Sequence, residues 1–260
     1  MTARYATVAA VGRGVRILEV LSRHPEGLSL TELAVTLETP AATVHRLLQS
    51  LQRGGYVARA TSGRHRLSLR IIGLAYRYVR ALDWKRNYAG VLEDVSATTG
   101  ELAQLAVVSE GVLFFLDKVE GHHALRVASL VGTEAPVHAT ASGKVWLASL
   151  TDDELLRALS RLELRPYTAR TIRDVDRLLA EIREIRVRGW ALTDEELMPG
   201  TCGLAVPIRP SSVPTVVGAL SVAFPALRRD EALRYYPAVL QEGGARLARF
   251  GNQVYEAFFA

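Results

Sequence analysis

The sequence predicts an α+β protein of two parts: three short helices completed by a β-hairpin, and then a larger part whose helices flank an antiparallel sheet. Three observations lead to this prediction. Residues 11–53 hold three segments with apolar residues at helical spacing, and residues 56–69 hold two short runs around a turn. From residue 86 onward, longer runs of alternating apolar and polar residues are interspersed with segments whose apolar residues recur at helical spacing. Charge is also divided, with +8 over residues 1–85 and −3 over the rest of the 260-residue chain.

The composition limits the class of protein. The chain is 49% hydrophobic and 23% charged, which is typical of a globular protein that buries a core. No apolar stretch reaches the ~18 residues of a membrane span, and residues 1–6 lack the apolar segment of a signal peptide. Cys202 is the only cysteine, which excludes an intrachain disulfide and a four-cysteine zinc site. We therefore expect a protein of the reducing cytoplasm.

The basic first third indicates a nucleic-acid partner. Residues 1–85 contain 13 Lys and Arg against five Asp and Glu. A basic module attached to a mildly acidic remainder is expected when one domain binds nucleic acid and the other does not. A solvated basic face without a partner is the alternative that charge alone leaves open.

Spacing and end signals predict the first three helices. Apolar residues recur at three- and four-residue intervals over residues 11–23, and a Pro-Glu-Gly sequence follows soon after. Ser29 and Glu32 form a capping box that begins a second helix. A third helix is predicted for residues 40–53, with Thr39 as its N-cap and Pro40 in its first position.

The third helix and the hairpin together predict DNA binding. One face of this helix is apolar, and the other carries small residues followed by hydrogen-bonding and basic side chains, which suits close approach to a major groove. The hairpin is predicted from residues 56–59 and 65–69, and Arg59, Arg64, His65 and Arg66 are expected to crowd its tip. This order of elements is that of a winged helix-turn-helix, whose partner is double-stranded DNA. The residues expected to contact DNA are Thr39, Ala41, Ala42, Thr43, His45, Arg46, Gln49, Arg59, Arg64 and Arg66.

A helix over residues 71–82 is expected to join the two parts. Leu74, Ala75, Tyr78 and Val79 give it an apolar stripe. The stripe is equally consistent with a dimer interface and with packing of the helix against its own domain.

The larger part is predicted to contain a sheet of five or six strands. A capping box at Thr151 and Glu154 begins one of its helices, and Thr171 is expected to open another, whose apolar face includes Val175 and which ends at Gly189. The expected strands are 101–108, 112–119, 125–130, 190–193, 203–208 and 216–223, and the other expected helices are 86–99, 142–150 and 230–260.

Four segments resemble the IclR-type family of bacterial transcription regulators. They are residues 28–56, residues 66–74 (RLSLRIIGL), residues 136–147 (PVHATASGKVWL) and residues 189–208 (GWALTDEELMPGTCGLAVPI). The resemblance implies a ligand-responsive repressor or activator with a GAF-like domain that binds a small-molecule effector. It also implies a homodimer paired through the DNA-binding half, and often a dimer of dimers. We accordingly predict a DNA-binding domain at 6–70, a linker helix at 71–85 and an effector domain at 86–260.

The same resemblance predicts the effector site. By position in the family signatures, the expected residues are Val127, Ser129, Ala141, Ser142, Gly143, Thr193, Asp194, Cys202, Gly203, Ser221 and Ala223. Residues 141–143 would begin a helix, where free N–H groups and the helix dipole favour a carboxylate, although a tight helix start is the simpler interpretation.

The effector is expected to differ from a small keto-acid. In the keto-acid-binding relatives an acid replaces Thr193, a cysteine replaces Gly203 and a second serine replaces Ala223. These departures favour a different or more apolar ligand, such as a carboxylate or an aromatic acid.

Other chemistries receive less support from the sequence. Gly143-Lys144 lacks the remaining residues of a phosphate loop, and His122, His123 and His138 lack the spacing of a metal site. A solvated turn is the favoured interpretation of the acidic run at 194–196. We predict no cofactor and no enzymatic activity. Two alternatives stay open: an enzyme acting on a small acid and tethered to a nucleic-acid anchor, or a second domain that serves only oligomerisation.

Overall fold

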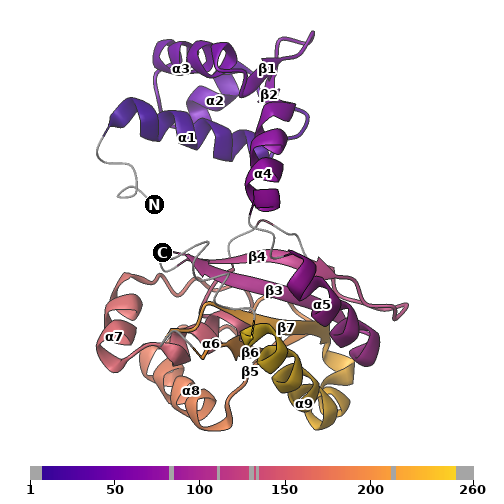
Figure 1. Cartoon of the computed structure of the whole chain (residues 1–260). Helices are drawn as coiled ribbons and strands as arrows, with labels where there is room; N and C mark the ends of the chain where they lie inside the picture. The colour runs from indigo at the N-terminus through magenta and orange to yellow at the C-terminus, as the bar shows by residue number, and fades with distance from the viewer. Residues whose placement is uncertain are drawn as a thin grey trace. The chain divides into compact units, whose positions relative to one another are not determined.

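The chain folds into two compact units, Met1–Asp83 and Trp84–Ala260. The computed structural model describes residues 8–81, 85–109, 112–128, 132, 135–211 and 215–249 (Figure 1). Within these ranges, no helix is both long enough and apolar enough to cross a membrane.

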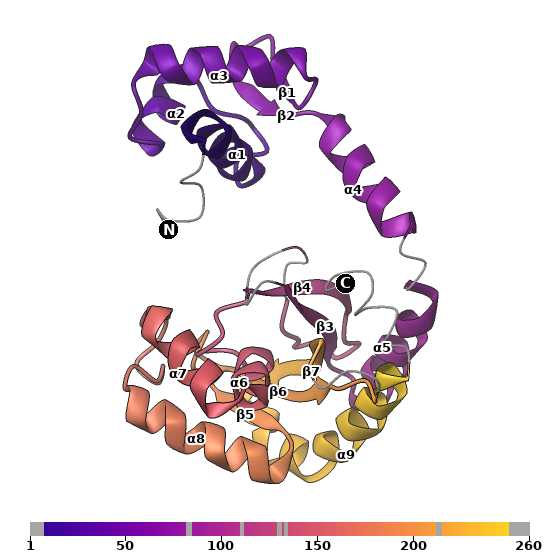
Figure 2. The ribbon, with the colours of Figure 1, turned by 60° about the vertical axis from the view of Figure 1, so that its left-hand side comes forward.

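The first unit is the predicted winged helix-turn-helix. It contains α1 (Ala9–Ser22), α2 (Leu30–Thr36), α3 (Ala41–Arg53), β1 (Val57–Arg59), β2 (His65–Leu67) and α4 (Leu69–Ala81) (Figure 2). Buried apolar residues of the first three helices, among them Ile17, Leu33 and Leu48, form its core. The two strands pair antiparallel with Val57 opposite Leu67, so the hairpin is confirmed, although its second strand ends at Leu67 because Leu69 already begins α4.

Two helix starts test the capping predictions. The capping box is confirmed: the Glu32 N–H donates to Ser29 Oγ, and the Ser29 N–H donates to the Glu32 carboxylate at 2.7 Å. The prediction for α3 is wrong by one residue, because Pro40 is the N-cap and Ala41 begins the helix. The Thr39 hydroxyl instead donates to the carbonyl of Leu37 at 2.9 Å, where it closes the end of α2.

The second unit is a five-stranded antiparallel sheet between two layers of helices (Figures 1 and 2). The strand order is β4 (Val112–Val119), β3 (Leu102–Ser109), β7 (Gly218–Pro225), β6 (Thr201–Ile208) and β5 (Ala191–Asp194). Helices α6 (Ala141–Ser149), α7 (Asp152–Arg161) and α8 (Val175–Arg188) lie on one side, and α5 (Lys85–Thr99) and α9 (Arg229–Ala248) lie on the other. A short 3-10 turn, η1 (Ala226–Arg228), leads into α9.

Glycines allow two helices to pack closely. A Cβ at Gly243 would come within 2.7 Å of Leu220 Cδ2, and a Cβ at Gly244 within 2.9 Å of Val206 Cγ2, so α9 rests directly on two central strands. A Cβ at Gly143 of α6 would overlap the backbone of Val137, in the segment that leads into this helix. The absence of a side chain therefore lets α9 lie close to the sheet and lets α6 lie close to the segment before it.

Two further predicted elements differ from the structure, and residues 250–260 of the predicted final helix lie outside the described residues. Residues 125–128 form no strand within the part of the segment that is described. Helix α8 begins at Val175 with Asp174 as its N-cap, whereas the Thr171 hydroxyl donates to the carbonyl of Glu196 at 2.6 Å. Val175 lies at the partly exposed start of the helix, outside its buried face.

The packing of Gly143 leads to a stability prediction. We expect Gly143→Ala to lower the free energy of unfolding by about 2 kcal/mol, because the added methyl group must displace the Val137 backbone or the helix. Denaturant unfolding measures this change. Gly90→Ala in α5 is the matched control, since a Cβ there meets no atom within 4 Å and should stabilise its helix by about 0.5 kcal/mol. Equal stability of the Gly143 variant and the wild type would contradict the close packing.

Candidate DNA-binding surface and ligand cavity

Helix α3 has the two faces that the sequence predicts. Val44 and Leu48 are buried against the other helices of the first unit. The opposite face is exposed, and it begins with side chains small enough to let the backbone approach a duplex. The exposed residues of this face are Ala41, Ala42, His45, Arg46 and Gln49. Thr39 and Thr43 are half-buried at the start of the helix.

The hairpin residues separate into two groups. Arg59 and Arg66 are exposed and available to a phosphate backbone. Arg64 is engaged inside the unit, where its Nε donates to the carbonyl of Gly27 at 2.9 Å and its guanidinium pairs with Glu32 at 3.2 Å. Arg64 therefore holds the hairpin to the start of α2.

His65 is not at the tip of the hairpin, which corrects the sequence prediction. It is buried, and its backbone pairs with Leu28 in an isolated bridge. Burial lowers the pKa of its imidazole, so the neutral form is favoured. The bridge and the Arg64 contacts together dock the hairpin against the segment before α2.

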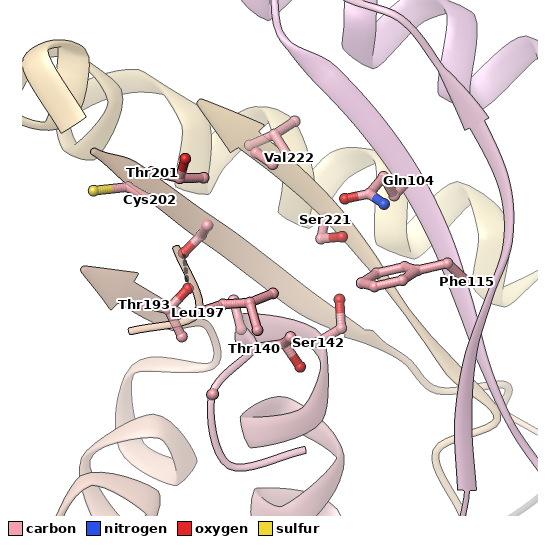
Figure 3. A pocket seen from close by; sticks show the side chains of 14 residues that line it. Gln104, Phe115, Thr140, Ser142, Thr193, Leu197, Thr201, Cys202, Ser221 and Val222 are labelled. Atoms are coloured by element: carbon pink, nitrogen blue, oxygen red, sulfur yellow. Dashed lines mark hydrogen bonds between the residues drawn. The ribbon is translucent and has the colours of Figure 1, made fainter. Parts of the chain in front are cut away.

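A small cavity of about 70 Å³ lies between the first turn of α6 and the sheet (Figure 3). Seven predicted effector residues border it: Ala141, Ser142, Thr193, Cys202, Gly203, Ser221 and Ala223. The sequence analysis missed seven others: Gln104, Phe115, Ala139, Thr140, Leu197, Thr201 and Val222. Gln104 lies opposite Ser221 in the register of β3 with β7, a long-range pairing that no local pattern reveals.

The first turn of α6 presents donors to the cavity. Thr140 is its N-cap, and the Thr140 hydroxyl accepts from the N–H of Gly143 at 3.1 Å while it donates to the carbonyl of Pro136. The N–H groups of Ala141 and Ser142 have no carbonyl partner within the helix, because the residues four positions before them lie ahead of its start. The positive end of the helix dipole adds to these donors, so this end of the cavity favours an anion.

The sheet side of the cavity carries a polar group without a partner. Ser221 is 4% exposed, and its Oγ forms no hydrogen bond with any of the described residues. Figure 3 shows its hydroxyl grouped with the Gln104 amide and the Phe115 ring. A buried hydroxyl without a partner costs about 1–3 kcal/mol, and a ligand that pairs with it regains that energy.

Not every predicted effector residue reaches the cavity. Gly143 serves the packing on Val137, in agreement with the simpler interpretation of a tight helix start. Asp194 pairs with Arg170 at 3.1 Å and with Arg229 at 3.5 Å, on the sheet face opposite to Thr193. Val127 is half-buried and does not line the cavity, and Ser129 lies outside the described residues.

Cys202 borders the cavity through its backbone. Its thiol points to the other face of β6, where Sγ lies 3.4 Å from Asp194 Oδ1. Burial and the neighbouring carboxylate raise the pKa of the thiol to about 12, so the thiolate that redox chemistry needs is disfavoured.

The remaining candidate chemistries find no site in the described part of the chain. Those residues contain no group of three or more metal-ligating side chains. His138 is buried, and its Nε2 lies 2.9 Å from the carbonyl of Arg165. The turn at 194–196 is not simply solvated, because Glu196 is buried.

The chain is similar to known proteins over nearly its whole length. The IclR helix-turn-helix domain matches residues 10–60, and the C-terminal domain of the bacterial transcriptional regulator IclR matches residues 76–247. The HTH-type transcriptional regulator XynR of Escherichia coli (strain K12) is 30% identical over 246 residues, which cover 93% of this chain and 96% of XynR.

Solved structures agree with this match. An IclR transcriptional regulator from Alicyclobacillus acidocaldarius gives a TM-score of 0.80 at 28% identity, over 93% of this chain and 98% of that chain. An IclR homologue from Microbacterium hydrocarbonoxydans, complexed with 4-hydroxybenzoate, gives a TM-score of 0.79 at 24% identity and covers 95% of this chain and 100% of that chain.

The relatives are named as transcriptional regulators and not as enzymes, which decides against a tethered enzyme. The chain therefore belongs to the IclR family of bacterial transcriptional regulators, with a DNA-binding helix-turn-helix domain followed by a ligand-binding domain.

Proposed function

We propose that this regulator reads an operator with the exposed face of α3 and responds to a small organic carboxylate in the cavity at the start of α6. The observation that carries the DNA half is the exposure of Arg46, His45 and Gln49 on one face of a helix whose other face is buried. These side chains can hydrogen-bond base edges, while Arg59 and Arg66 suit the flanking phosphates.

The carboxylate is supported by two sides of the cavity. The N–H groups of Ala141 and Ser142 favour an anion on the helix side, and the Ser221 hydroxyl needs a hydrogen-bond partner on the sheet side. Between them, Phe115, Leu197 and the glycine at 203 offer little polarity. The ligand is therefore an acid with an apolar body and a second polar group.

The size of the cavity limits the ligand further. Its volume of about 70 Å³ is below the roughly 150 Å³ of an engineered cavity that binds benzene. A short aliphatic acid fits the present shape, whereas an aromatic acid such as 4-hydroxybenzoate requires Leu197 or Phe115 to move outward. Ligand binding can change operator affinity only if the ligand binds two arrangements of the protein with different affinities. Which arrangement the ligand prefers decides whether it promotes or releases operator binding.

We propose a homodimer that pairs through α4. The helix exposes large apolar residues, including Leu69 at 82%, Ile72 at 51% and Tyr76 at 66%. A second copy is the occupant that fits, because helix-turn-helix proteins read two half-sites as symmetric dimers and α4 directly follows the hairpin.

The first prediction concerns operator binding. Arg46→Ala should weaken binding about 10- to 100-fold, because one charge-assisted contact to a base or phosphate is lost. Electrophoretic mobility shifts at fixed salt measure this on an operator selected from random DNA by the wild-type protein. Arg157→Ala on α7 removes the same charge from the other unit and should leave affinity unchanged. Equal affinities of the two variants would refute the assignment of α3.

The second prediction concerns the cavity. Small carboxylates, tested as acetate, benzoate and 4-hydroxybenzoate, should raise the melting temperature, whereas the matching neutral amides should not. Ser221→Ala should reduce that rise while making the unliganded protein at least as stable as wild type, because the hydroxyl that is removed is buried without a partner among the described residues. Stabilisation by no acid, or by amides and acids alike, would argue against a carboxylate effector.

The third prediction concerns the dimer. Ile72→Asp should shift the protein toward monomer in analytical ultracentrifugation, because a charge would be buried in an apolar interface. Val35→Asp is the control, since Val35 is 73% exposed on α2 and lies outside the proposed interface. A dimer that survives the Ile72 change as well as the Val35 change would place the interface elsewhere.

A further inference from the structure

A fully buried lysine stands one turn into α6, beside the cavity. Lys144 has no exposed side-chain surface, and its Nζ lies 2.5 Å from Glu196 Oε1 and 2.9 Å from Glu181 Oε2. The three residues come from α6, from the turn after β5, and from α8. Residues 141 and 142 of the same helix line the cavity.

Glu196 belongs to a turn that forms part of the cavity wall. The next residue, Leu197, lines the cavity, and so does Thr201 where β6 begins. The turn is tightly held: the Glu195 N–H donates to the Thr201 carbonyl at 3.0 Å, and the Gly200 N–H donates to Glu195 Oε2 at 2.7 Å. Glu195 adopts a positive φ of 58°, which a residue with a side chain seldom takes.

The ion pair is a weak source of stability, because removing its charges from water costs free energy. Glu196 Oε2 is buried without a hydrogen bond to any described residue, and burial raises the pKa of this carboxyl even though Lys144 opposes the shift. Replacing such a buried pair by apolar side chains is often neutral or stabilising. A contribution to geometry accounts for the pair better than a contribution to stability does.

We infer that Lys144 is a positioning residue of the ligand cavity, because its ion pair with Glu196 holds the turn bearing Leu197 at a fixed distance from the first turn of α6. This rests on the proposed role of the cavity, since the distance sets the space open to a ligand. Glu181 steadies the lysine from α8 without contributing to the cavity wall.

The test uses hydrogen exchange in the full chain without ligand, so that its result does not depend on the identity of the effector. The double variant Lys144→Met/Glu196→Met removes the pair without leaving a buried charge on either residue. We expect exchange of the Glu195, Gly200 and Thr201 amides to accelerate on the order of tenfold, while amides of β7 and the melting temperature stay close to wild type. Glu196→Gln, which removes only the charge, should produce a smaller acceleration at the same amides and serves if the double variant fails to fold.

Arg186→Met is the matched control. Arg186 also ties α8 to the α6 region, through Asp152 at 2.6 Å and the carbonyl of Ala148 at 3.1 Å, but it acts at the far end of α6. Unchanged exchange in the variants that lack the Lys144 pair would overturn the inference, as would equal acceleration in Arg186→Met or throughout the sheet. If the exchange result holds but no carboxylate binds, the positioning role stands and the proposed ligand class fails.

Discussion

The ligand-binding unit depends on how closely α6 approaches the sheet. One position without a side chain allows this approach: a Cβ at Gly203 would lie 2.9 Å from Thr193 Oγ1 and 3.7 Å from Ala141 Cβ. Gly143 instead packs α6 against the segment that precedes it, because a Cβ there would overlap the Val137 backbone. The helix can therefore begin directly above β5 and β6, and its first N–H groups have no partner inside the helix. The cavity is the space that remains between the helix start, these strands and the side chains of β3 and β4.

The sequence predicts the fold because most of its signals are local. Apolar spacing and capping boxes identified the helices, and alternation identified the five strands of the sheet within a few residues. The segment at 125–128 was the exception, because its alternating pattern has no neighbouring strand there. The cavity was only half predictable, since Gln104 and Phe115 reach it through the register of β3 with β7 and β4, which follows from long-range pairing.

The wrong assignments share a physical cause, namely a polar side chain whose partner lies in another segment. Thr39 and Thr171 looked like helix caps because Thr is favoured there, but each hydroxyl pairs with a carbonyl outside the helix expected of it. Arg64 was expected to contact DNA, and in the structure its guanidinium also pairs with Gly27 and Glu32, so its contact with DNA stays a prediction. A sequence shows which groups can hydrogen-bond, whereas the fold decides which partner each one meets.

The stiffness of the cavity wall has a consequence for ligand selection. A ligand larger than the cavity of about 70 Å³ gains space when Phe115 or the turn that carries Leu197 moves outward. Moving the turn outward pulls Glu196 away from Lys144, and separating two buried charges is unfavourable. A small acid binds without this penalty, so the ion pair discriminates by size although neither of its residues borders the cavity.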